Sequence, residues 1–215
     1  MKIGILGSGI VGQTLGSKLV ELGHHVRMGS RDAANPKVAE WVAAAGSHAS
    51  QGDFADAAAF GEVVFLCTKG DVALAVAEGA ADGLAGKPLV DVSNPLDFSR
   101  GFPPTLSVCN TDSLGEQLQR AVPEARVVKA LNTMWCGVMV DPRRLAGGHV
   151  VFLCGNDDGA KATVRQLLAG FGWRDEEIVD LGDISGARGT EMLLPLWLRL
   201  YVARGDGAFN LAIVT

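Results

Sequence analysis

The stretch Met1-Lys2-Ile3-Gly4-Ile5-Leu6-Gly7-Ser8-Gly9-Ile10-Val11-Gly12 opens the chain and decides how the rest of it folds. Its apolar part, residues 3–6, is typical of a buried strand, and the pattern Gly7-x-Gly9-x-x-Gly12 follows at once. Apolar residues then recur with helical spacing over residues 14–22. A strand, a glycine-rich turn and a helix in this order predict a dinucleotide-binding unit.

The three glycines have separate roles in this prediction. Gly7 permits the tight turn, Gly9 lets a pyrophosphate approach the backbone, and Gly12 lets the helix pack closely on the strand. The free N–H groups at the helix start, with the helix dipole behind them, would hold the phosphates. The alternative is an ordinary strand-to-helix turn, which the flanking strand and helix make the weaker interpretation.

Composition sets the class of protein. The 215 residues are 48% hydrophobic and 20% charged, which indicates a folded globular protein. The net charge is −5 and no block of like charges occurs, so we expect neither nucleic acid nor a membrane as a partner. Because the first strand begins at once, we expect no signal peptide, and the apolar run at residues 192–198 is too short to span a bilayer.

The four cysteines have no pairing pattern. Cys67, Cys109, Cys136 and Cys154 form no C-x-x-C motif, and their spacing relative to the four histidines suggests no metal site. We therefore expect no bound metal. Reduced thiols in a cytoplasmic enzyme are the simplest interpretation.

Apolar strands alternate with helices along the whole chain. Strands are predicted at residues 3–6, 25–28, 47–50, 62–68, 88–92, 126–131, 150–154 and 177–181. Helices are predicted at 14–22, 36–46, 53–60, 71–80, 113–122, 156–171 and 185–203, with Asp71 and Ser113 as N-caps and a break near Pro195.

This alternation predicts an α/β fold of the Rossmann type, a doubly wound and mostly parallel sheet with helices on both faces. No repeat or linker divides the chain. Residues 1–215 are therefore expected to form one dinucleotide-binding domain. A helical extension from about residue 183 would pack on that domain or on a partner.

The tip of the second strand favours NADP over NAD. NAD sites place a carboxylate there, whereas NADP sites place an Arg near the 2′-phosphate. Here the tip is Gly29-Ser30-Arg31, so Ser30 offers a hydroxyl and Arg31 a planar fork suited to phosphate. Asp32 has the spacing of an NAD carboxylate but is expected to face solvent or cap the next helix. Lys37 is a second candidate for the phosphate, and equally a solvated lysine.

Three other strand ends should line the path from the adenosine half to the nicotinamide, because ligands bind at the carboxyl ends of such strands. They are Thr68-Lys69-Gly70, Ser93-Asn94-Pro95-Leu96 and Leu131-Asn132-Thr133-Met134. Asn94 and Asn132 carry neutral donors and acceptors suited to a carboxamide, although Asn is also a common turn former. Lys69 could meet an anion or lie exposed.

No acid–base constellation stands out, so no catalytic side chain is assigned. His149 precedes a strand and is expected to be structural, and Cys136 is expected to be an inert apolar group. Hydride transfer between two ring systems requires proximity, orientation and exclusion of water more than a general acid.

Taken together, these motifs resemble the NADP-dependent oxidoreductases of coenzyme F-420 (F420), an 8-hydroxy-5-deazaflavin. The stretches that carry the resemblance are residues 7–12, Gly29-Ser30-Arg31, Asn94-Pro95-Leu96, residues 130–133, residues 154–158, and Asp180-Leu181-Gly182 with Arg188 and the closing helix. The resemblance covers nearly the whole chain. Lys69 and Trp135-Cys136 depart from the family pattern where the second substrate should lie.

The resemblance implies a set of binding roles. Ser8, Ile10 and Val11 would hold the pyrophosphate of NADPH, and Ser30 and Arg31 its 2′-phosphate. Thr68, Asn94 to Leu96 and Asn132 would hold the nicotinamide half. The deazaflavin would stack over the nicotinamide and exchange hydride with it directly, in a homodimer. The chain also resembles the cytosolic NADPH domain of six-transmembrane ferric reductases, which feeds a flavin, so a flavin or quinone acceptor stays open.

Two other functions compete with an NADPH-dependent deazaflavin or flavin reductase. Reductases of small organic substrates usually carry a large helical second domain, and only about thirty-five residues follow Leu181 here. A non-catalytic NADP-binding or sensing module is the other alternative, since a fold alone does not establish catalysis. The apolar closing segment, residues 192–198, is expected to form a dimer interface.

Overall fold

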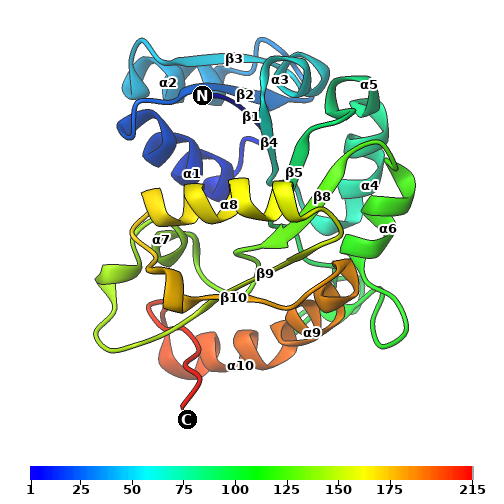
Figure 1. Cartoon of the computed structure of the whole chain (residues 1–215), viewed down its shortest axis with the longest axis vertical. Coiled ribbons are helices and arrows are strands. Elements are labelled where there is room, and N and C mark those ends of the chain that lie inside the picture. Colours follow the sequence, from blue (N-terminus) through cyan, green and yellow to red (C-terminus); the bar gives the residue numbers. More distant parts are fainter. Residues whose placement is uncertain (215) are drawn as a thin grey trace.

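Eight strands form one sheet in the order β10-β9-β8-β5-β4-β1-β2-β3 in this computed structural model, which describes residues 1–214 (Figure 1). The strands are β1 (Lys2–Leu6), β2 (His25–Ser30), β3 (Ala49–Asp53), β4 (Val63–Leu66), β5 (Pro88–Asp91), β8 (Arg126–Ala130), β9 (Val151–Gly155) and β10 (Ile178–Asp180), with a separate hairpin of β6 (Leu96–Asp97) and β7 (Thr105–Leu106). The α-helices are α1 (Ile10–Glu21), α2 (Pro36–Ala45), α3 (Phe54–Phe60), α4 (Gly70–Gly79), α5 (Ala81–Leu84), α6 (Leu114–Ala121), α7 (Cys136–Met139), α8 (Asp158–Gly170), α9 (Ala187–Met192) and α10 (Leu194–Arg204). The 3-10 turns are η1 (Pro142–Arg144), η2 (Asp175–Glu177) and η3 (Ile184–Gly186).

Helices cover both faces of the sheet and enclose two hydrophobic cores. One core lies under α1, α2, α7 and α8, and the other under α3, α4, α5 and α6. Successive strand residues alternate between the two cores, so that Phe65 of β4 packs in the first and Leu66 in the second. The Rossmann-type α/β fold predicted from the sequence is confirmed.

The sheet is parallel from β3 through β1 to β8, and then reverses. β9 pairs antiparallel with β8, and β10 runs parallel to β9. A parallel connection must carry the chain back to the opposite end of the strands, usually through a full helix. Only the short helix α7 and the turn η1 join β8 to β9, so β9 starts at the same end of the sheet at which β8 finishes.

Several element boundaries differ from those predicted. The third strand is Ala49–Asp53, later than the predicted 47–50. Helix α4 begins at Gly70 with Lys69 as N-cap, so Asp71 lies in its first turn and is not the cap. The closing helix is divided near Pro195 as predicted, into α9 and α10, which meet at Leu193 with Pro195 in the first turn of α10. The hairpin of β6 and β7 and the short helices α5 and α7 were not predicted.

Within residues 1–214, no helix has the length and apolarity needed to cross a membrane.

Candidate functional site

Two clefts adjoin along the carboxyl ends of the parallel strands. The first cleft, about 600 Å³, runs from residues 7–9 past Ser30, Arg31 and Asp32 to the start of α4. The second cleft, about 730 Å³, lies between the start of α4, the residues after β5, and the hairpin of β6 and β7. Thr68, Lys69 and Asp71 line both, so the two clefts adjoin at these residues. This is the edge at which ligands bind in doubly wound sheets.

The glycine turn has the geometry that the sequence predicts. Gly7 has a φ of +128°, and a β-carbon there would stand 2.7 Å from the carbonyl of Cys67, so only glycine fits. A β-carbon on Gly12 would stand 2.0 Å from the Gly7 carbonyl oxygen, which shows how closely α1 packs on β1. Around Gly9, in contrast, no atom of residues 1–214 lies within 4 Å of an added β-carbon. The backbone at Gly9 is therefore open to a ligand.

The start of α1 is free to bind an anion. Its N-cap is Gly9, which has no side chain to accept the first N–H groups, and the first turn contains no acidic residue. Ser8 lines the first cleft, and its carbonyl accepts a hydrogen bond from Gln13 Nε2 at 3.1 Å. Val11 is half-buried against the core, whereas Ile10 is 71% exposed. The helix dipole and the uncapped N–H groups favour a phosphate here.

At the tip of β2 the two predicted phosphate ligands differ in solvent exposure and in hydrogen bonding. Arg31 is exposed and lines the first cleft. Ser30 also lines it, but is 4% exposed and donates its hydroxyl hydrogen to the Asp32 carbonyl at 2.6 Å. The Asp32 carboxylate accepts from Ala34 N at 2.9 Å, within the loop, and Asn35 caps α2. Asp32 is exposed, as expected from the sequence, and it also lines the first cleft.

Thr68 follows β4 at the junction of the two clefts. Its Oγ1 atom is buried and has no hydrogen-bond partner within residues 1–214. An unpaired buried hydroxyl is unfavourable, so this atom indicates a missing polar partner. Neighbouring Cys67 lines the first cleft, and burial together with the Asp91 carboxylate raises the pKa of its thiol well above the ordinary value. That thiol stays protonated and is not a nucleophile.

Two asparagines join the ends of β5 and β8. The Asn94 Nδ2 donates to the Asn132 carbonyl at 2.9 Å, and the Asn132 Nδ2 donates to Asn94 Oδ1 at 2.9 Å. Asn94 lines the second cleft, and Asn132 is 3% exposed behind it. Asn132 therefore holds the side-chain amide of Asn94 in a fixed orientation at the wall of the second cleft.

Beneath this pair lies a buried ionic triad that sequence reasoning missed. Lys129 Nζ contacts the carboxylates of Asp91 at 2.8 Å and Glu191 at 2.7 Å, and all three side chains are at most 2% exposed. Burial alone would lower the pKa of Lys129, but the two carboxylates raise it above its ordinary value. Asp91 and Lys129 are register partners in adjacent strands, so opposite charges in two apolar strands were the available signal.

The predicted site residues divide into three groups. Seven line the first cleft, namely Gly7, Ser8, Gly9, Ser30, Arg31, Thr68 and Lys69. Asn94 and Leu96 line the second cleft, with Pro95 between them and Asn132 bonded to Asn94. Val11 and Gly12 lie within α1, Ile10 lies at the end of another groove, and Lys37 is exposed in the first turn of α2, outside the lining of the first cleft.

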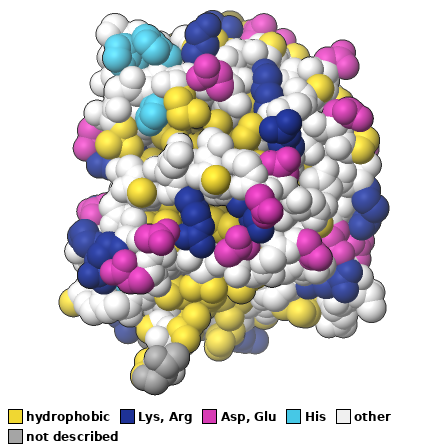
Figure 2. All heavy atoms as spheres, in the orientation of Figure 1, with side chains coloured by type: hydrophobic (Ala, Val, Ile, Leu, Met, Phe, Trp, Pro, Cys, Tyr) yellow, Lys and Arg dark blue, Asp and Glu magenta, His cyan; other side chains and the backbone are white. Residues whose placement is uncertain are grey.

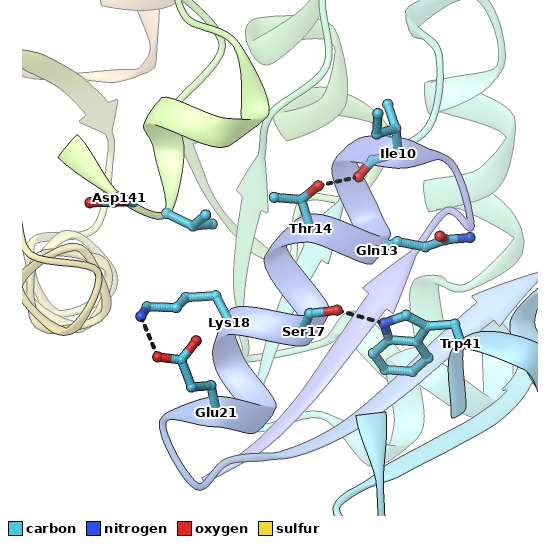
Figure 3. A pocket seen from close by; sticks show the side chains of 9 residues that line it. Ile10, Gln13, Thr14, Ser17, Lys18, Glu21, Trp41 and Asp141 are labelled. Atoms are coloured by element: carbon cyan, nitrogen blue, oxygen red, sulfur yellow. Dashed lines mark hydrogen bonds and ion pairs between the residues drawn. The ribbon is translucent and has the colours of Figure 1, made fainter. Parts of the chain in front are cut away.

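The groove that Ile10 reaches runs along the outer face of α1 and has a volume of about 670 Å³ (Figure 3). Its polar side chains are bonded to neighbours: Thr14 Oγ1 donates to the Ile10 carbonyl, Trp41 Nε1 to Ser17 Oγ, and Lys18 pairs with Glu21. None of the strand ends predicted to bind the cofactor lines this groove. We therefore place the candidate site in the two clefts.

Two residues expected to be structural are buried. His149 is 5% exposed, and its ring nitrogens are bonded to the Pro142 carbonyl and the Asn210 amide, both at 2.9 Å. Cys136 is 4% exposed in the core beside Thr14. Among residues 1–214, no cluster of three His, Cys, Asp or Glu side chains could hold a metal ion.

The chain is similar to several known proteins. Residues 2–95 match the family model described as NADP oxidoreductase, coenzyme F420-dependent. The crystal structure of a proposed F420-dependent NADP reductase from Arthrobacter sp. FB24 is 50% identical, superposes with a TM-score of 0.94, and is covered fully, as is this chain.

Two curated proteins are also similar. F420-dependent NADP reductase from Methanocaldococcus jannaschii is 29% identical over 71% of this chain and 69% of its own length. Metalloreductase STEAP3 from Rattus norvegicus is 34% identical over 91% of this chain, but the chain spans only 38% of that protein.

Proposed function

Since the chain belongs to the coenzyme F420-dependent NADP oxidoreductase family, and is an NADP-dependent oxidoreductase, we propose that it transfers hydride between NADP(H) and a deazaflavin, coenzyme F420. One observation carries the proposal. The uncapped start of α1, the exposed Arg31 and the buried Thr68 hydroxyl, which has no hydrogen-bond partner within residues 1–214, all border the first cleft. A phosphate-rich dinucleotide matches these groups in charge and in hydrogen bonding.

The phosphates of NADP(H) would lie in the first cleft. The N–H groups at Ser8, Ile10 and Val11 are the proposed pyrophosphate donors, because α1 begins there without a cap. Arg31 is the proposed ligand of the 2′-phosphate. Ser30 could assist only by turning its hydroxyl away from the Asp32 carbonyl. Lys37 would act only at long range, since it does not line the cleft.

The nicotinamide half would lie where the two clefts meet. Thr68, Lys69, residues 94–96 and Asn132 are the proposed contacts, and the two asparagines hold each other in a fixed orientation. When bound, NADP(H) supplies the hydride. The side chains supply orientation, which is the main requirement of hydride transfer between two rings. No side chain in the clefts is proposed as a general acid or base.

The second cleft is the proposed place of the acceptor. Its volume of about 730 Å³ suits a planar three-ring compound. Phe98, which is 56% exposed, lines it and offers an aromatic surface for stacking. The similarity to a metalloreductase favours a second candidate, in which electrons pass onward to a metal. In that candidate the hydride goes first to a flavin, the acceptor that the resemblance to ferric reductases implies. A quinone or a small organic acceptor finds no such specific support.

A homodimer is proposed from the apolar surface at the C-terminal end. Figure 2 shows hydrophobic side chains gathered near the lower edge, beside α10 and the tail. Leu196, Tyr201 and Val202 of α10 and Ile213 and Val214 of the tail are 42–92% exposed. Covering them with a second copy would remove this surface from water. Light scattering should give the mass of a dimer, and Val202→Glu that of a monomer; a monomeric parent protein would reject the idea.

Two further expectations stay proposals. We propose that residues 1–215 act as one NADP-binding domain whose closing segment, from about residue 183, packs on that domain or on a partner copy. A cytoplasmic location is proposed because Cys67, Cys109, Cys136 and Cys154 are all free thiols.

The test of the function is turnover with defined acceptors. NADPH would be mixed with oxidised F420, FMN, a soluble quinone or a ferric chelate plus FMN, and loss of the reduced nicotinamide absorbance followed. Oxidation is expected with F420 and to be much slower with the others. Oxidation that requires FMN, with none by F420, would replace the proposal with the flavin reductase. No oxidation by any acceptor would contradict both.

A further inference from the structure

We propose that Glu191, on helix α9, is a positioning residue for the nicotinamide half of NADP(H), acting through Lys129 and Ser93 on Asn94. The inference rests on the proposed placement of NADP(H), and it does not depend on the acceptor. It assigns a role in the site to the C-terminal extension, which lies beside α6 and far along the chain from the glycine turn (Figure 1).

Glu191 is held by three donors. Its Oε2 accepts from Leu114 N at 2.8 Å, and its Oε1 accepts from Gly115 N at 3.0 Å and from Lys129 Nζ at 2.7 Å. The two N–H groups belong to the start of α6, where the helix dipole favours a carboxylate. The side chain is 2% exposed, so these bonds are shielded from bulk solvent. Glu191 therefore fixes α9 to both α6 and β8.

Lys129 passes this constraint to Ser93. An ammonium group has three N–H donors, and those of Lys129 are all used, by Glu191, by Asp91 Oδ2 and by the Ser93 carbonyl at 2.7 Å. Asp91 Oδ1 in turn accepts from both the backbone N–H of Ser93, at 2.9 Å, and its hydroxyl, at 2.5 Å. The N, O and Oγ atoms of Ser93 are thus all held by the triad.

Ser93 directly precedes Asn94 in the chain, so the triad fixes the position of the Asn94 backbone. The Asn94 amide is then oriented by its two bonds with Asn132. Loss of the Glu191 charge would leave Lys129 with one carboxylate partner and free it to shift, and the Ser93 carbonyl would shift with it. The first cleft contains none of the triad, so its adenosine and 2′-phosphate contacts would stay in place.

Stability alone is a poor explanation for the triad. The attraction within a buried ion pair offsets only part of the free-energy cost of removing both charges from water. Well-packed apolar residues can replace such a pair without loss of stability. A second ion pair joins the same two helices: Arg188 of α9 and Glu116 of α6 lie 37% and 11% exposed. That pair contacts neither Lys129 nor Ser93. It is therefore a matched control for the attachment of α9 to α6.

The experiment compares two ligands on Glu191→Gln and Glu116→Gln. The first ligand is NADPH, and the second is 2′,5′-ADP, which carries the adenosine and 2′-phosphate without the nicotinamide. Both dissociation constants would be measured by calorimetry, together with thermal unfolding. For Glu191→Gln we expect the Kd of NADPH to rise about tenfold, because the loss of a hydrogen bond to a charged group displaces Asn94 beside the nicotinamide half. The Kd of 2′,5′-ADP should stay unchanged, because this ligand has no nicotinamide half. For Glu116→Gln the ratio of the two constants should not move.

Equal weakening of both ligands by Glu191→Gln, or no weakening of either, would overturn the inference. If Glu191→Gln does not fold, Ser93→Ala carries the test, because it removes only the hydroxyl bond to Asp91 and keeps all three charges. It too should weaken NADPH and spare 2′,5′-ADP, and an unchanged ratio of the two constants would overturn the inference. Failure of 2′,5′-ADP to bind the parent protein would instead refute the proposed cofactor site.

Discussion

Gly12 lies so close to Gly7 that a β-carbon on Gly12 would stand 2.0 Å from the Gly7 carbonyl oxygen. Gly9, between them, would place a β-carbon in open space. Two glycines of one motif are therefore required for different reasons, one by the protein's own packing and the other by the proposed ligand.

Alanine substitutions should separate these reasons. Gly12→Ala should lower the free energy of unfolding by about 1–3 kcal/mol or more, because backbone must move to admit the methyl group. Gly9→Ala should change it by only about 1 kcal/mol or less, the effect of altering an N-cap. Gly9→Ala should nevertheless weaken NADPH binding, since its methyl group occupies the approach to α1. Chemical unfolding and NADPH titration measure both. Wild-type affinity in Gly9→Ala would refute the phosphate site.

Arg31 should decide the preference for NADPH. Arg31→Ala removes a charge-assisted contact worth about 1.5–3 kcal/mol, so the Kd of NADPH should rise about 10- to 100-fold while that of NADH stays constant. Lys37→Ala should have a smaller effect, because Lys37 lies outside the first cleft. Arg126→Ala is the control, since Arg126 begins β8 at the opposite edge of the sheet. Equal affinities of the parent protein for NADPH and NADH would contradict the assignment.

Thr68→Val should change stability and binding in opposite directions. The Thr68 Oγ1 atom is buried and has no partner within the described residues, so its replacement by a methyl group should stabilise the unliganded protein by about 1 kcal/mol. The same change should weaken NADPH binding, because the ligand loses its hydrogen-bond partner. Melting temperatures with and without NADPH test both effects. A destabilised apo protein would mean that Thr68 is satisfied internally.

The free energy of unfolding should depend on pH through Glu177. Burial alone would raise the pKa of Glu177, but hydrogen bonds from Arg143 and from the backbone and guanidinium of Arg174 lower it to about 2. A carboxyl with a lowered pKa stabilises the fold fully above its unfolded value, 4.5, and loses this contribution as the pH falls toward 2. The shift corresponds to up to about 3 kcal/mol.

Unfolding free energies measured across this pH range test the prediction. Glu177→Gln should be less stable than the parent protein at neutral pH and should lose stability less steeply below pH 4.5. The control is Glu176→Gln, because the Glu176 side chain is 69% exposed and forms an ion pair with Arg174 at 3.2 Å. Parallel pH curves for Glu177→Gln and the parent would show that Glu177 does not contribute.

The sequence predicted local structure well because the signals are local. The glycine turn, the Asn35-Pro36 start of α2 and the alternation of strands and helices each depend on neighbouring residues. The direction of β9 could not be predicted in this way. An apolar run fits a parallel or an antiparallel strand equally, and only the length of the connection after β8 decides.

The site was predicted in part for the same reason. Residues at strand ends could be placed together because parallel strands finish at one edge. The distance of Lys37 from the first cleft depends on how α2 turns after the loop, and the position of Ile10 depends on which face of α1 meets the groove. The ionic triad joins Asp91, Lys129 and Glu191 across three elements, and only the fold brings Glu191 to the other two.

The four thiols differ in their expected reactivity toward labelling reagents. Burial raises the pKa of Cys67, raises that of Cys154 to about 12, and shields Cys136, whereas Cys109 is exposed between β7 and α6. A maleimide dye should therefore attach to Cys109 alone, without any engineered change. Nearby Ser107 lines the second cleft, so such a dye would report directly when an acceptor binds there.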